Sequence, residues 1–191
     1  MVLRVTRYGE SVLKAVGAKV TAFDAELKQL ADDMVETMRA EEGIGLAAQQ
    51  VDQALQLFVV ELPADMEAEA LGSYLLDGKQ PPLELIMPLV AINPELELSG
   101  DDAPYEEGCL SFPEIRGVVE RPLEAKMKYQ DVQGGWHELI CGGLFARVLQ
   151  HEYDHLQGVL FTERMRPGIL RPLEAKIRRL RKETRAAQKA D

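Results

Sequence analysis

The sequence QHEYDHLQG at residues 150–158 contains two of the chain's three histidines, with a glutamate directly after the first. On a helix of about 3.6 residues per turn, His151 and His155 lie one turn apart on the same face, so both imidazoles can reach one metal ion. Glu152 lies about 100° further round the helix, beside the ion and not on it. The spacing therefore favours a helix that carries two metal ligands and one acid–base group.

The flanking residues extend this segment into an amphipathic helix, with glycines at 142–143 and 158 that are typical of helix ends. Two neighbouring seams face inward: Leu144, Val148, His151 and His155, and then Phe145, Leu149, Glu152 and Leu156. The expected outer face consists of Arg147, Gln150, Asp154 and Gln157. We therefore expect only three inward ionisable groups, the ones that would serve a metal. The competing interpretation is a structural helix whose histidines have this spacing by chance.

Length and composition favour one soluble domain. The chain has 191 residues, 46% of them hydrophobic, which is enough to bury a core. Its two cysteines, Cys109 and Cys141, do not make a disulfide framework. No segment is apolar for long enough to span a membrane, and residues 1–7 lack the features of a signal peptide. We expect a cytoplasmic protein with no membrane partner.

The charge is unevenly distributed. The net charge is −10, yet residues 168–191 hold eight Lys or Arg against three acids, a local +5, so the rest carries −15. An acidic body argues against DNA binding, whereas a basic terminal helix can meet a polyanion or simply be a solvated helix. A stripe along this helix gives it a side to dock on the body or on a partner: Leu170, Leu173, Ile177 and Leu180.

Periodicity predicts several other elements. A capped helix is expected over residues 24–40, and buried strands over 57–62 and 89–93. Residues 124–140 alternate around an Asp-Val-Gln-Gly-Gly turn and predict a β-hairpin. The stretch 63–88 is acidic and proline-rich, so we expect an exposed insertion with a short helix around residues 67–76 and part of its apolar content packed on the body.

Two further motifs contain residues suited to a site. Residues 43–50 read GIGLAAQQ, and two glycines one residue apart let an extended peptide approach the backbone closely, although this signal is weak alone. Cys109 follows Gly108 in a segment bounded by two prolines, where we expect a loop that presents a thiolate.

A catalytic metal site normally has three protein ligands, so two histidines leave one to find. Phe161 stands where one class of metallopeptidase has a third histidine after the glycine. Glu174 lies among arginines, where an ion pair is the simpler interpretation. Cys109 is the better candidate.

In three blocks, in the same order, the chain resembles the peptide deformylase family: GIGLAAQQ at 43–50, EGCLS at 107–111 and QHEYDH at 150–155. The fold expected from this resemblance and from the predicted elements is α+β, with mostly antiparallel β-sheets packed around a central metal-binding helix, an N-terminal helix and a basic C-terminal helix. Residues 1–167 would form a single catalytic domain, which includes the 63–88 insertion, and residues 168–191 the basic helix and tail.

The resemblance also implies roles for individual residues. The metal ligands would be Cys109, His151 and His155. Glu152 would be the general base, and the Gln50 amide with the backbone N–H of Leu110 would stabilise the oxyanion. A thiolate with two imidazoles suits Fe²⁺, which the resemblance implies as the native ion, with Zn²⁺ or Ni²⁺ as substitutes.

The implied reaction removes the formyl group from N-formylmethionine on a nascent chain and releases formate. The substrate backbone would lie along Ile44 and Gly45 on one side and Gly108 on the other. Leu144 and Val148 are the candidates for its side-chain pocket. We expect a monomer, with the ribosome as a partner of the basic helix. The alternatives are a generic His-Glu-x-x-His metallopeptidase and a non-catalytic ribosome-binding relative.

Overall fold

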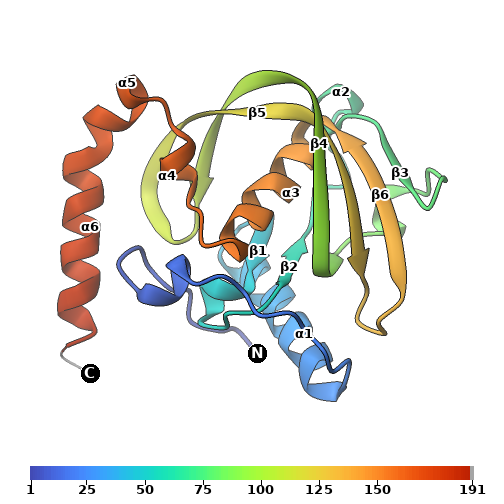
Figure 1. Cartoon of the computed structure of the whole chain (residues 1–191), viewed down its shortest axis with the longest axis horizontal. Helices are drawn as coiled ribbons and strands as arrows, with labels where there is room; N and C mark the ends of the chain where they lie inside the picture. The colour runs from blue at the N-terminus through green and yellow to red at the C-terminus, as the bar shows by residue number, and fades with distance from the viewer. Residues whose placement is uncertain (190–191) are drawn as a thin grey trace.

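The computed structural model describes residues 1–189 and combines helices with an antiparallel sheet of six strands in the order β1-β2-β4-β5-β6-β3 (Figure 1). The strands are β1 Gly45–Ala47, β2 Leu57–Val60, β3 Tyr74–Leu76, β4 Leu89–Cys109, β5 Phe112–Gln130 and β6 Trp136–Gly142. The combination of helices with antiparallel strands agrees with the α+β prediction.

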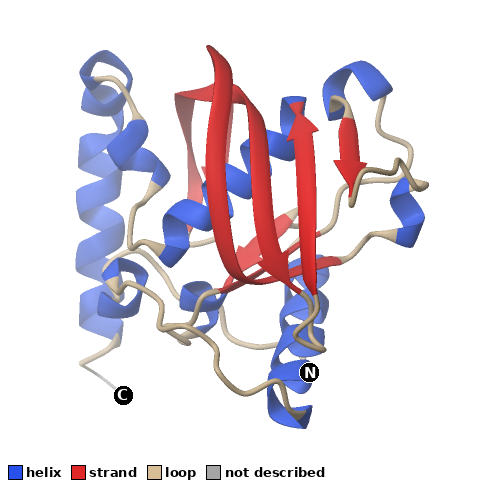
Figure 2. Ribbon diagram, turned by 45° about the vertical axis from the view of Figure 1, so that its right-hand side comes forward, coloured by secondary structure: helices blue, strands red, loops and turns tan. Residues whose placement is uncertain are grey.

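Helix α3, Gly143–Leu156, crosses one face of this sheet diagonally (Figure 2). Its apolar side chains enter the largest buried cluster, which also receives residues from β2, β4, β5 and β6. The other α-helices are α1 Ala25–Ala40, α2 Ala68–Leu71, α4 Phe161–Arg164, α5 Pro167–Leu170 and α6 Glu174–Ala187. The 3₁₀ turns are η1 Ser11–Lys14, η2 Ala48–Val51, η3 Leu83–Leu85 and η4 Arg171–Leu173.

Helix α1 confirms the prediction for residues 24–40. The Asp24 side chain accepts a hydrogen bond from the backbone N–H of Leu27 at 2.9 Å and so caps the helix. Met34 and Met38 are fully buried in a second cluster, against the backs of β1 and β2. The helix thus supports the short strands that border the site.

The long hairpin β4–β5 differs from its prediction. Only its two ends, residues 89–93 and 124–130, were expected as strands, because the residues after 93 are polar and mostly exposed and give no apolar pattern. Cys109 was expected in a loop, but it is the last residue of β4 and pairs with Phe112 across a two-residue turn. The strand therefore fixes the position of the cysteine more firmly than a loop would. The predicted hairpin of β5 with β6 is confirmed.

The stretch 63–88 is only partly exposed. Leu71, Tyr74 and Leu83 are buried in the main cluster, and β3 extends the sheet by pairing with β6. The helix expected around residues 67–76 is limited to α2, because Gly72 adopts a left-handed φ of 81° and the chain then turns into β3.

The C-terminal segment is not one continuous helix. Residues 167–187 form α5, η4 and α6, with Pro172 at the break. Figure 1 shows α6 along the side of the molecule, beyond the turn of the β4–β5 hairpin. Its leucine and isoleucine stripe packs on a cluster that includes Phe112 and Ile115, so the apolar side docks on the body. The predicted helix end at residues 190–191 lies outside the described part of the chain. Within residues 1–189, no helix has the length and apolar character needed to cross a membrane.

Candidate active site

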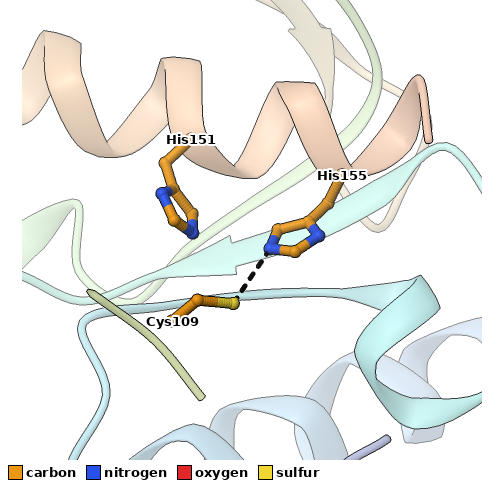
Figure 3. A group of neighbouring side chains, drawn as sticks. All are labelled: Cys109, His151 and His155. Carbon is orange, nitrogen blue, oxygen red and sulfur yellow. Dashed lines mark hydrogen bonds between the residues drawn. The ribbon is translucent and has the colours of Figure 1, made fainter. Parts of the chain in front are cut away.

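Three side chains from two elements converge at one point: Cys109 at the end of β4, and His151 and His155 on α3 (Figure 3). One potential ligand atom from each lies within 4.8 Å of the other two. The Cys109 Sγ is 3.4 Å from Nε2 of His155. The i, i+4 spacing on α3 places both imidazoles on one helix face, and the strand end places the thiol opposite them.

Glu107 orients the first histidine. Its carboxylate lies 3.0 Å from Nδ1 of His151, so in the neutral imidazole this nitrogen carries the proton and the lone pair is on Nε2, beside Cys109. Second-sphere carboxylates commonly fix metal-binding histidines in this way. The arrangement gives His151 one defined tautomer.

Glu107 itself belongs to a buried charge network. It accepts hydrogen bonds from Arg121 at 2.7 Å and from Arg147 at 2.8 Å, and Arg121 also donates to Asp154 at 2.8 Å. Arg147, Gln150 and Asp154 were expected on the outer face of the helix, and that prediction was wrong because β5 covers this face. The helix therefore has four buried ionisable groups, with His151 nearly buried beside them, where only three were expected to face inward.

The buried charges around the site affect its two histidines in opposite ways. Burial alone would raise the pKa of the Glu107 carboxyl, but hydrogen bonds from His151 and Arg121 outweigh it and hold this pKa well below its usual range. Burial opposes a charged His151, but Cys109 and Glu107 raise its pKa to about 10. Burial and the neighbouring His151 lower the pKa of His155, which favours its neutral, ligating form. A metal ion bound here would displace a proton from His151, because a ligating imidazole is neutral.

Glu152 lies beside the cluster and lines the same cleft, with only 4% of the residue exposed. Its Oε2, like Nδ1 of His155, has no hydrogen-bond partner among the residues that the structure describes. Burial raises the pKa of Glu152 to about 7. A Cβ at Gly45 would lie 2.3 Å from Oε1, so the glycine of β1 is what leaves room for the carboxylate.

Gln50 presents an amide N–H to the same space. Its Oε1 accepts from the backbone N–H of Ala47 at 2.9 Å, which turns Nε2 toward Cys109 Sγ at 3.4 Å and Ser111 Oγ at 3.3 Å. Leu110 forms the turn between β4 and β5, and Arg7 donates to its carbonyl at 3.0 Å. The two residues expected to stabilise an oxyanion are therefore oriented by hydrogen bonds, Gln50 by Ala47 and Leu110 by Arg7.

A cleft of about 620 Å³ leads to these side chains. Its lining includes all five residues expected to contact substrate: Ile44, Gly45, Gly108, Leu144 and Val148. None of the described lining residues comes from the 63–88 stretch. β1 is the edge strand of the sheet, so its outer side is open to pairing with an extended peptide.

Comparison with known proteins agrees with this geometry. The polypeptide deformylase family model matches residues 2–169. The chain belongs to this family.

Individual deformylases match over nearly the whole chain. Peptide deformylase from Opitutus terrae is 49% identical over 191 residues, which cover 99% of this chain and 98% of that protein. The crystal structure of the Thermotoga maritima deformylase has a TM-score of 0.73 and 37% identity, covering 87% of this chain and 99% of that one. The Synechococcus elongatus deformylase in complex with actinonin has a TM-score of 0.76 and 36% identity. The match covers 91% of this chain and 85% of that one.

Sequence reasoning missed the charged residues that support the site of this deformylase. Glu107 stood within one of the three blocks but received no role. Arg147, His151 and Asp154 follow i, i+4 and i+7 spacing, which places them on one helix face and was a readable signal. Arg121, on β5, had no local signal because its partners lie 14 and 33 residues away.

Proposed function

We propose that this deformylase is a metal-dependent hydrolase that removes the N-formyl group from the formylmethionine of newly made proteins and releases formate. The observation that carries the proposal is Glu152: a buried carboxylate with a raised pKa that lines a cleft beside Cys109, His151 and His155. Family membership supports the same reaction.

Cys109, His151 and His155 would hold the metal. A thiolate and two imidazoles are ligand types that both Zn²⁺ and Fe²⁺ accept. Three protein ligands leave a position for substrate or water. Once bound, the cation would supply a Lewis acid that polarises the formyl carbonyl and makes water more acidic.

The protein's own groups would then manage the proton and the developing charge. Glu152 accepts the proton of the attacking water and returns it to the amine nitrogen as the C–N bond breaks. Burial raises the pKa of this carboxyl towards neutrality, which favours a group that can both accept and return a proton. The Gln50 amide and the backbone N–H of Leu110 donate to the negative charge that develops on the formyl oxygen.

The cleft would hold the peptide part of the substrate. The backbone would pair with the open edge of β1 at Ile44 and Gly45, opposite Gly108, while the methionine side chain would enter beside Leu144 and Val148. Gly45 also lets the substrate backbone come near Glu152, since no side chain lies between them.

The direct test is to measure formate release and metal content together, on wild type and Cys109→Ala in parallel, with a formyl-Met peptide. We expect formate from the wild type, and loss of both metal and turnover from the variant. A variant that keeps metal and activity would favour a metallopeptidase with another third ligand. Competition by actinonin, which the Synechococcus elongatus relative binds, would place the reaction in this cleft.

The native ion we propose is Fe²⁺, with Zn²⁺ or Ni²⁺ as substitutes, because a soft thiolate with two imidazoles accepts all three. A cytoplasmic location, a monomeric state and the division into a catalytic domain at 1–167 and a basic segment at 168–191 stay predictions.

The exposed basic side chains of α6 are our proposed ribosome contact. The helix docks on the body through its apolar stripe, which leaves Arg181, Lys182 and Arg185 exposed. Replacing these three residues by glutamine should weaken co-sedimentation with ribosomes, most clearly at low salt, and leave turnover of short peptides intact. Unchanged co-sedimentation would reject this contact. Truncation is a poorer test, because it would remove apolar residues that pack behind Phe112.

A further inference from the structure

One wall of the cleft is a bulge in β5 that the sheet does not hold by itself. Gly108 pairs with Arg116 and Cys109 with Phe112, so residues 113–115 have no partner residues on β4. All three line the cleft, and Glu114 adopts a left-handed φ of 57°. The Glu114 side chain is 85% exposed, which places the bulge at the cleft rim.

The C-terminal helix holds this bulge from behind. The Lys176 ammonium donates to the backbone carbonyl of Glu114 at 2.6 Å and lies 3.5 Å from its carboxylate. The next residue, Ile177, is buried in the same apolar cluster as Ile115, which is 1% exposed. One turn of α6 therefore supplies both a polar and an apolar contact to a segment that lacks strand partners.

The segment before α6 is fitted against the same strand. Met165 forms an isolated antiparallel bridge with Val119. A Cβ at Gly117 would lie 2.5 Å from Cε of Met165, so the close approach needs a glycine in β5. The C-terminal segment thus contacts β5 at several points between residues 114 and 119.

We infer that α6 is a positioning element of the substrate cleft, in which Lys176 holds the rim at Glu114 for the part of the peptide that follows the formylmethionine. The inference rests on the proposed function and adds to it a determinant of peptide binding. Lys176 contacts neither the metal-binding side chains nor Glu152, so its effect falls on KM for extended peptides and not on kcat.

The test is Lys176→Met in the full chain, with kcat and KM measured separately for a formyl-Met dipeptide and a formyl-Met pentapeptide, together with metal content. We expect KM for the pentapeptide to rise about three- to tenfold, the range for loss of one ordinary hydrogen bond, because the Lys176 side chain is half-exposed. KM for the dipeptide, kcat and metal content should stay as in the wild type. Lys176→Arg should restore much of the affinity, because arginine keeps the charge and the donor.

A control variant separates this contact from a general charge effect. Lys182→Met removes the same charge from an exposed position on α6 and should stay close to wild type. Equal KM values for Lys176→Met and wild type, or an equal rise in Lys182→Met, would overturn the inference. A wild type that releases no formate would overturn the proposed function, and this inference with it.

Discussion

The Glu107 carboxylate accepts a hydrogen bond from Nδ1 of His151 at 3.0 Å while it also pairs with Arg121 and Arg147. One buried anion thus fixes a histidine tautomer, joins α3 to β5 and balances two buried guanidinium groups. Glu107 therefore contributes both to the stability of the fold and to the orientation of a metal-binding histidine.

Glu107→Gln should lower metal affinity about 10- to 100-fold, because an amide is a weaker acceptor and leaves the imidazole less basic and less firmly oriented. Stability should fall as well, since two buried arginines lose their anion. Metal titration by competition with a chelator measures the first effect and thermal unfolding the second. Glu106→Gln is the matched control, because the neighbouring carboxylate has an exposed ion pair with Arg116. Wild-type metal affinity in Glu107→Gln would contradict the positioning role.

The pH dependence of stability should carry a signature of His137. This side chain contacts Asp77 at 2.7 Å and Asp131 at 3.1 Å, and so ties the turn after β3 to the β5–β6 turn. The Asp77 hydrogen bond, with Asp131, raises the pKa of His137 above 6.5, and His137 lowers the pKa of Asp77 below 3.8.

A raised histidine pKa stabilises the fold fully below pH 6.5, and this contribution is lost as pH rises through the folded-state value. The lowered aspartate pKa adds stability above pH 3.8 that is lost in stronger acid. The wild type should therefore unfold a few degrees above His137→Gln between about pH 4 and 6.5, equivalent to roughly 1 kcal/mol. The gap should shrink towards pH 9. A gap of constant size across this range would show that charge on His137 is not its cause.

The ion that binds most tightly should not be the one that gives the fastest turnover. Zn²⁺ binds more tightly than Fe²⁺ in the divalent series, but it favours closed tetrahedral coordination, whereas Fe²⁺ accepts an additional ligand more readily. Enzyme loaded with Fe²⁺ without oxygen should outpace the Zn²⁺ form and lose activity in air, as the iron and the Cys109 thiolate oxidise. Equal turnover at matched occupancy would contradict this coordination argument and leave the proposed ligands unaffected.

Local patterns predicted the parts of the molecule that depend on local physics. The cap at Asp24, the turn at residues 131–135 and the helical spacing of His151 and His155 are set by neighbours in sequence, and the structure has them. The buried positions of Arg147 and Asp154 depend on β5, which packs on their helix face from a distant part of the chain. Polar residues on a helix face read as solvent-exposed unless the covering strand is known.

The same distinction explains Cys109 and the C-terminal segment. The residues before Cys109 are polar, glycine-containing and exposed, so nothing in their pattern predicted a strand held by pairing with β5. The apolar stripe of the last helix was visible, but whether it covers the body or a partner depends on a matching apolar surface, here around Phe112 and Ile115.

The central claim is that Glu152 moves the proton of the reaction and does not hold the metal. Its most direct test is to measure the metal content and the formate release of Glu152→Gln beside those of the wild type. We predict full metal occupancy with turnover lowered by at least about 100-fold, because the amide cannot accept and return a proton. Loss of the metal from the variant, or turnover near the wild-type rate, would contradict the claim.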